Sequence, residues 1–212
     1  MKNFKILFTI SIIIPTILFT SCNKDEKTDN SSTETTGVLT DSRDGKIYKW
    51  VKIGNQYWMA ENLNYDASSG IWIYNNDSNN ADTYGRLYNW ETACDVCPDG
   101  WHLPSDAEFT SLVNYLGGKN VAGGKMKEAG TIHWDSVNEG ATNESGFSAL
   151  PGGYCNMVSN FDELGYGAYF WSSTKGVIQN YAYYRTLYHH NSIVTRYEYG
   201  KEYGYSVRCV RD

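Results

Sequence analysis

The last 45 residues contain four segments typical of β-strands, and these segments constrain the fold more than any other feature of the sequence. They read AYFWSST, YAYYRTLY, IVTRYEY and YSVRCVRD, and turn-forming stretches such as HHNS and GKEYG separate them. Neighbouring strands that are joined by short turns pair in the antiparallel sense. We therefore expect an antiparallel meander at the end of the chain.

A β-hairpin is predicted closer to the start of the domain. The segment KIYKWVKIGNQYWMAENLNY alternates apolar and polar residues on both sides of Gly54 and Asn55, and this pattern is typical of two strands joined by a tight turn. Residues 66–83 read as a polar loop. The stretch from about residue 129 to residue 167 is rich in Gly, Ser and Asn and reads as a second, longer loop.

Helices are predicted between the hairpin and the meander. Ser105 and Glu108 match a capping box, and Phe109 and Leu112 begin the apolar stripe of the helix that follows. A weaker helical turn is predicted over 121–128, and a short helix is plausible over 87–94. Helices set apart from an antiparallel sheet predict an α+β fold, and the sequence shows neither a βαβ alternation nor an internal repeat.

The N-terminal segment has the layout of a secretory signal. Two lysines precede an apolar run, and small residues lead to Cys22. The run is short for a membrane span, which needs roughly 20 apolar residues. The string LFTSC resembles the lipobox of bacterial lipoproteins, in which the cysteine is acylated. We expect a signal peptide over 1–21, a membrane partner reached through lipid on Cys22, a flexible polar tether over 22–40 and a single domain over 41–212.

The location implied by this layout is the outer membrane of a bacterium. The acidic start of the tether resembles the signal that sends some lipoproteins to the outer face of that membrane, so surface exposure is expected, and a periplasmic position is the alternative. Without residues 1–21, the chain keeps all 24 acidic residues and 16 of its 18 basic residues, a net charge of about −8. This charge argues against nucleic acid as a partner.

Four cysteines remain after Cys22, and two of them, Cys94 and Cys97, are two residues apart. A redox pair would need a helix N-terminus inside a βαβ unit, and a zinc site would need two further ligands at a matching spacing. In an exported chain, four cysteines more often form two disulfides, and the sequence leaves all three connectivities open. His102 is expected to have no catalytic role.

Other polar clusters point more weakly to chemistry. Residues 75–82, NNDSNNAD, offer oxygen ligands, and Asp77 with Asp82 is a candidate calcium site that lacks the spacing of an EF-hand. Neighbouring residues of a strand point to opposite faces, so His189 and His190 are poorly placed to share a metal. We expect no cofactor, and we recognise no arrangement typical of an enzyme.

The meander is unusually rich in tyrosine, and the chain has 18 tyrosines and 7 tryptophans in total. Strand alternation places Tyr181 and Tyr183 on one face and Tyr184 and Tyr188 on the other. Two interpretations remain open. Both faces are packed, one on the helices and one under loops, or one face is an exposed aromatic platform for sugar or peptide.

Several short motifs occur in one order, and together they carry a resemblance. They are VKIGNQYWMAENLNY, YGRLYNW, CPDGWHLPSDAEF, LGG, ATNESGFSALPGGY, FWSST and YSVRCVRD. This string resembles the Fibrobacter succinogenes major paralogous domain family over residues 45–212. The resemblance implies a bacterial surface lipoprotein with a C-type-lectin-like fold, in which two helices pack on a twisted antiparallel sheet with long loops.

The resemblance also bears on the disulfides and on the ligand. Cys97 and Cys209 fall inside recurring motifs and are expected to pair, which leaves Cys94 and Cys155 to pair by elimination. The motifs with which C-type lectins bind sugar through calcium are absent from this sequence. The expected function is a binding module for glycan or protein, and the alternatives are a structural component of the cell envelope or an enzyme of unrecognised type. The candidate ligand contacts are loop residues, namely Trp72, Tyr74, Asn75, Asp77 and Tyr154.

Overall fold

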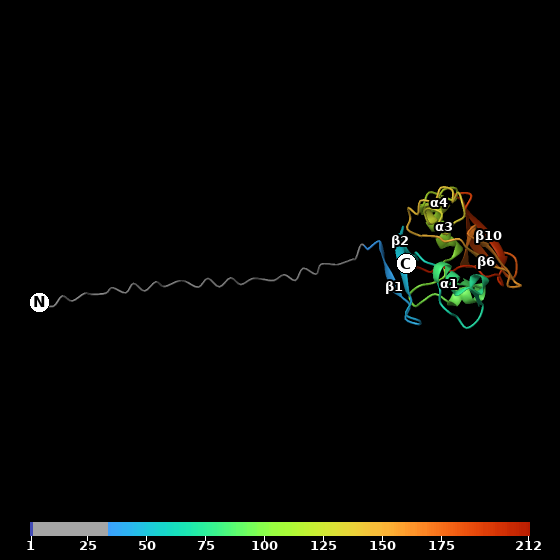
Figure 1. The fold of residues 1–212 in the computed structure, drawn as a ribbon, viewed down its shortest axis with the longest axis horizontal. Coiled ribbons are helices and arrows are strands. Elements are labelled where there is room, and N and C mark those ends of the chain that lie inside the picture. Colours follow the sequence, from blue (N-terminus) through green and yellow to red (C-terminus); the bar gives the residue numbers. More distant parts are fainter. Residues whose placement is uncertain (2–33) are drawn as a thin grey trace. The chain divides into compact units, whose positions relative to one another are not determined.

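The structure, a computed structural model, describes Met1 and residues 34–212 (Figure 1). The predicted signal peptide, the predicted lipidation site Cys22 and the first part of the predicted tether lie outside the described residues. Residues 34–212 form one compact unit. Among the described residues, no helix has the length and apolar character that crossing a membrane requires.

The predicted hairpin is present and forms the centre of a four-stranded antiparallel sheet. Strand β2 (Ile47–Ile53) pairs with β3 (Gln56–Met59), and Gly54 adopts a φ of 63° in the turn between them. The strand order is β1-β2-β3-β11, so β1 (Thr36–Thr40) and β11 (Val210–Arg211) form the two edges. Figure 1 shows the C-terminus next to β2, although these two parts of the chain are far apart in the sequence.

Strand β1 changes the expected start of the folded domain. The tether was predicted to extend to residue 40, but Thr36–Thr40 pairs in full register with β2. Gly37 lies directly against the ring of Trp50, where a Cβ atom would be only 2.7 Å from Trp50 Cε2. A segment with few apolar side chains is therefore ordered by backbone pairing and by one close glycine contact, which composition does not reveal.

The predicted meander forms a second antiparallel sheet in the order β10-β9-β8. Its strands are β8 (Gly167–Lys175), β9 (Tyr181–Tyr188) and β10 (Val194–Gly200). The fourth predicted strand does not continue this sheet. Its end, Val210–Arg211, pairs with β3 instead, because Val210 exchanges two backbone hydrogen bonds with His102, each 2.9 Å long, and the neighbouring Cys209 is bonded to Cys97.

The described residues contain four α-helices, whereas the family resemblance implied two and the sequence pattern predicted three helical segments. They are α1 (Ser78–Tyr84), α2 (Trp90–Asp95), α3 (Asp106–Tyr115) and α4 (Ala122–Met126), with a 3-10 turn η1 (Tyr74–Asn76) before α1. The predicted capping box of α3 is confirmed. Ser105 Oγ accepts a hydrogen bond from the backbone N–H of Glu108 at 3.2 Å. In return, the Glu108 carboxylate accepts a hydrogen bond from the backbone N–H of Ser105 at 2.7 Å.

The two segments that were predicted as loops contain short elements. Strand β4 (Ile71–Trp72) pairs with β5 (Leu87–Tyr88), so α2 begins only after β5 and not at residue 87. Strand β6 (Gly152–Cys155) pairs with β7 (Phe161–Leu164). Two-residue strands leave too weak a sequence pattern to be recognised, because their stability comes from the core beneath them.

The core consists of two large clusters of buried side chains. One lies between the N-terminal sheet, α3 and β9, and includes Trp58, Phe109 and Phe170. The other lies under α2, β5 and the opposite face of β9, and includes Trp171 and Tyr205. Helices and antiparallel sheets therefore share the core, and the predicted α+β class is confirmed.

Candidate functional site

Seven tyrosine side chains line a single pocket of about 180 Å³. They come from β6, β8, β9, β10 and the segment after β10, and they are Tyr154, Tyr169, Tyr184, Tyr188, Tyr199, Tyr203 and Tyr205. We call this group the tyrosine pocket. No other part of the described chain gathers as many aromatic side chains around one opening.

The floor of the tyrosine pocket is rigid and buried. Tyr169, Tyr184 and Tyr205 expose 9% or less of their surface, and the Tyr205 ring lies 5.4 Å from Tyr169 and 4.7 Å from Tyr184. Trp171 supports the floor from below, with its ring 4.4 Å from Tyr205 and its indole N–H donating to the carbonyl oxygen of Tyr88 at 2.8 Å. The floor side chains therefore have little rotational freedom left to lose when a ligand binds.

The rim of the tyrosine pocket is open to solvent. Tyr154, Tyr188 and Tyr203 are half-buried, and Tyr199 is 42% exposed. The Tyr199 and Tyr203 rings meet edge to face at 4.7 Å, and Tyr154 contacts both Tyr169 and Tyr203. The rim thus offers a ligand both ring faces and ring edges.

The three buried phenol groups of the pocket floor stay neutral well above physiological pH. Burial raises the pKa of Tyr184 to about 12, and it raises the pKa values of Tyr169 and Tyr205 further. The hydroxyls of Tyr169 and Tyr188 lie 3.1 Å apart and hydrogen-bond to each other. A neutral phenol both donates and accepts a hydrogen bond, so the pocket combines apolar rings with polar groups of either kind.

Strand alternation explains why the tyrosines gather on one side of the meander sheet. Tyr184 and Tyr188 share a face of β9, as predicted, and both line the pocket. The other face carries Arg185, which donates to the backbone oxygen of Asp106 at 3.0 Å and thereby packs on α3. Tyr183 belongs to that second face, where Arg196 lies 3.7 Å above its ring. Both of the interpretations given above are thus partly right, because one face is packed on a helix and the other is only partly covered.

The five predicted ligand contacts do not meet at one site, although Trp72 and Tyr74 pack in the same small cluster of buried side chains. Trp72 packs against Gly204, where a Cβ atom would be 2.8 Å from Trp72 Cε3, and Tyr74 is 8% exposed with its ring 5.2 Å from Phe161. Asn75 is exposed with a φ of 54°, and the Asp77 carboxylate caps α1 by accepting from the backbone N–H of Asn79 at 3.0 Å.

Of those five residues, the structure places only Tyr154 in the tyrosine pocket. Tyr169 was not among the residues predicted to form the site, although its segment, AYFWSST, was predicted to be a strand. The period-2 alternation of that strand is the signal that would have placed Tyr169 on a defined face.

The disulfide between Cys97 and Cys209 is confirmed, with the Cα atoms 5.9 Å apart. The second predicted bridge, Cys94 to Cys155, is wrong, because both thiols are free. Cys155 is fully buried in β6, in a small cluster with Tyr74 and Leu87, whereas Cys94 packs at the end of α2 against a different cluster. Burial raises the pKa of each thiol to about 11, so neither is a reactive thiolate at neutral pH.

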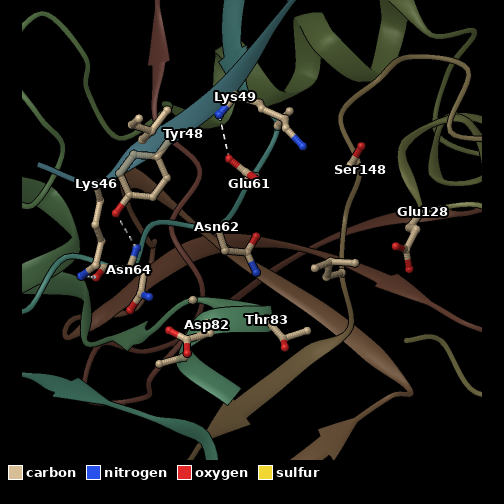
Figure 2. A pocket seen from close by; sticks show the side chains of 15 residues that line it. Lys46, Tyr48, Lys49, Glu61, Asn62, Asn64, Asp82, Thr83, Glu128 and Ser148 are labelled. Carbon is tan, nitrogen blue, oxygen red and sulfur yellow. Dashed lines mark hydrogen bonds between the residues drawn. The ribbon is translucent and has the colours of Figure 1, made fainter. Parts of the chain in front are cut away.

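A second cavity, of about 500 Å³, opens between β2, the segment after β3 and α1 (Figure 2). We call it the polar cleft. Lys46 and Lys49 lie on its upper side in Figure 2, Asp82 and Thr83 below them on α1, and Glu128 to one side. Its charges are therefore of both signs, and no single class of ligand is favoured by charge.

The floor of the polar cleft rests on a buried arginine. The Asn62 carboxamide, at the centre of Figure 2, donates to the Tyr84 carbonyl at 2.8 Å and accepts from Arg208 Nε at 2.6 Å. Arg208 is fully buried and also donates to the backbone oxygens of Met59, Phe147 and Ser148. Burial lowers its pKa, and carbonyl dipoles take the place of a carboxylate partner. The arginine thus fixes the cleft floor, and this is a structural role.

The candidate metal ligands are dispersed. Among the residues that the structure describes, no three His, Cys, Asp or Glu side chains are close enough to hold a metal ion together. Asp77 is engaged as a helix cap and Asp82 lines the polar cleft. His189 and His190 lie in the turn after β9, where the His190 ring stacks on Tyr188 at 5.5 Å.

Comparison with known proteins gives one match. A model of the Fibrobacter succinogenes major domain matches residues 51–211, which include the tyrosine pocket and most of both core clusters. No curated protein and no solved structure matches the chain. The matched residues cover about three quarters of the sequence, and the chain therefore belongs to the Fibrobacter succinogenes major domain family.

Proposed function

We propose that this protein is a non-enzymatic binding module that recognises glycan through the tyrosine pocket. The observation that carries the proposal is the convergence of seven tyrosines on one opening. Sugars present apolar C–H faces and a ring of hydroxyl groups, and they need a partner with both characters. Aromatic rings with neutral phenols meet that need without adding charge.

The proposal extends to the fold and the cellular location. We propose a C-type-lectin-like fold, which is consistent with the mixture of short helices, small antiparallel sheets and irregular connections. We also propose that the protein is an outer-membrane lipoprotein on the bacterial surface, anchored through acyl chains on Cys22. That part rests on the sequence of the N-terminal segment. A binding module at the cell surface would meet extracellular glycans directly.

The test is a screen of the purified protein on glycan and protein arrays, with and without Ca²⁺, followed by Tyr154→Ala. The Tyr154 ring contacts both the floor and the rim of the pocket. We expect glycan binding that does not depend on Ca²⁺ and that falls at least about tenfold in the variant. Tyr115→Ala is the matched control, because Tyr115 is 68% exposed on α3 and lies outside the pocket. Binding of a protein alone, or no binding at all, would contradict the proposal.

A second candidate function is an assembly role in the cell envelope. The observation that favours it is the outer edge of the N-terminal sheet, where β1 pairs only with β2 among the described strands. Val38 and Ile47 lie beside this edge and are 65% and 63% exposed. An exposed strand edge with apolar side chains is a ready site for adding a strand from a partner. Crosslinking in intact membranes that captured a stable partner through β1 would favour this function over glycan binding.

A further inference from the structure

Aromatic rings continue beyond the tyrosine pocket in both directions. Strand alternation places Tyr181 with Tyr183, on the face opposite Tyr184 and Tyr188. At the very start of β9, however, the Tyr181 ring lies 5.7 Å from Tyr199, which itself contacts Tyr203. At the other end, the His190 ring stacks on Tyr188. We call the partly exposed members of this row the aromatic strip, and they are Tyr181, Tyr199, Tyr203, Tyr154, Tyr188 and His190.

The aromatic strip is continuous. Successive rings from Tyr181 to Tyr154 are between 4.7 and 6.1 Å apart. Between Tyr154 and Tyr188, the buried Tyr169 ring closes the gap, with centroids 5.1 and 6.1 Å from the two rim rings. A ligand that lies along the strip would therefore remain in contact with aromatic surface over its whole length.

The length of the strip exceeds that of one sugar. It runs from the first residue of β9, Tyr181, to the turn just after the last residue, Tyr188. Seven residue steps of a strand span about 23 Å. The pocket of about 180 Å³ is only the middle of this path, and a single sugar ring placed in it would leave both ends of the strip uncovered.

The charges along the strip select against an acidic chain. Glu163 is half-buried beside Tyr169 at the His190 end. At the other end, the Glu202 carboxylate lies next to Gly200, and Glu198 accepts a hydrogen bond from the backbone N–H of Val177. The nearby Lys201 is directed to Glu91, 3.5 Å away, and to the face of Trp90. At the Glu163 end, His189 and His190 are basic groups, and the buried Lys127 ammonium donates to the backbone oxygen of Tyr188 at 3.0 Å.

We propose that the aromatic strip binds an extended, neutral polysaccharide chain that runs along β9, with one sugar of the chain seated in the tyrosine pocket. This inference rests on the proposed glycan-binding function and specifies the class of glycan. Several rings that are held in place by a buried floor each add contact area at low entropic cost. Affinity should therefore rise with the number of sugars until the strip is full.

The experiment is calorimetric titration of the full chain with cello-, xylo- and manno-oligosaccharides of one to about six sugar units. Oligogalacturonides of the same lengths serve as the acidic arm. For the neutral series that binds, we expect the dissociation constant of the longest member to be at least about tenfold lower than that of the disaccharide. The acidic series should bind more weakly at every length.

Two kinds of variant separate the ends of the strip from its centre. Tyr181→Ala and His190→Ala should weaken binding of the longest oligosaccharide several-fold and leave the disaccharide unchanged, whereas Tyr154→Ala should weaken both. Tyr115→Ala is the control for both lengths, and the thermal unfolding midpoint of each variant shows whether its fold is intact.

The outcomes distinguish the two proposals. If no glycan of any length binds, glycan recognition by the pocket is refuted. If the mono- or disaccharide binds as tightly as the longest member, the pocket binds sugar but the extended-chain inference is wrong. If oligogalacturonides bind more tightly than the neutral series, the neutral class is wrong.

Discussion

Removal of the Cys97–Cys209 disulfide should destabilise the domain by a large and calculable amount. The two cysteines are 112 residues apart, so the bond closes a loop of more than half the chain. The entropy that such a loop removes from the unfolded state corresponds to about 5 kcal/mol at 25 °C in the chain-entropy model. That is a large share of the roughly 5–15 kcal/mol that stabilises an ordinary domain.

The native structure around the bond should survive its removal. The two backbone hydrogen bonds between His102 and Val210, each 2.9 Å long, hold the same two segments together beside the disulfide. The effect should therefore fall mainly on the unfolded state. We expect the Cys97→Ala/Cys209→Ala variant to fold with an unchanged near-ultraviolet spectrum but to unfold at a urea concentration lower by about 2.5 M, for a denaturant slope of about 2 kcal/mol per molar.

The assay is urea unfolding followed by tryptophan fluorescence, on the variant and on the parent protein with and without dithiothreitol. Reduction leaves the side chains in place and should reproduce most of the shift. Cys94→Ala is the matched control, because that thiol is free and only three residues from Cys97, and it should shift the free energy of unfolding by less than about 1 kcal/mol. A double variant as stable as the parent, or peptide mapping that joins Cys94 to another cysteine, would refute the reasoning.

Three further predictions test other parts of the structure. Arg208→Met should lower the free energy of unfolding by at least about 3 kcal/mol in the same urea assay, since it leaves several buried oxygens without a hydrogen-bond donor. Arg208→Lys should not restore this stability, because an ammonium group cannot reproduce the planar arrangement of N–H donors in a guanidinium group. An alkaline titration followed at 295 nm should leave Tyr169, Tyr184 and Tyr205 un-ionised until the protein unfolds. The pKa values of these tyrosines in the folded protein lie above the unfolded value of about 10, so the stability that they contribute is complete below pH 10 and is lost as the pH rises toward 12 and beyond. For Tyr184 alone, the loss in the free energy of unfolding is about 3 kcal/mol. Ionisation of every tyrosine near pH 10 would contradict this prediction. Ser105→Ala should cost about 1 kcal/mol in thermal unfolding, because it removes the cap of α3, and no measurable loss would show that the capping box contributes nothing.

Elements with a strong local pattern could be predicted from the sequence. The hairpin at Gly54 and the capped helix after Ser105 depend on residues within a few positions of each other, and both are present. The α+β class follows from those elements together with the three strands of the meander. The Cys97–Cys209 pairing was reached through the family motifs and not through any local rule.

Elements that are stabilised mainly by distant residues could not be predicted. Strand β1 is polar in sequence and is ordered by pairing with β2, and the final strand leaves the meander because Cys209 and Val210 are held to the segment between α2 and α3. The elimination argument for Cys94 and Cys155 failed because it assumed that every exported thiol is paired, whereas the fold buries these two in different clusters.

The candidate site shows the same division. From the sequence it could be predicted that the chain is an α+β member of its family, that its last strands are crowded with tyrosine, and that Tyr184 and Tyr188 share a face. The packing of the whole domain brings tyrosines from four strands and the segment after β10 to one opening, with Tyr169 and Tyr205 as a buried floor and Tyr199 as an exposed rim. The pocket could not be predicted because strand alternation fixes only the face of the sheet on which a side chain lies. The neighbours that the side chain meets on that face depend on how the rest of the fold brings β6, β8, β9 and β10 together.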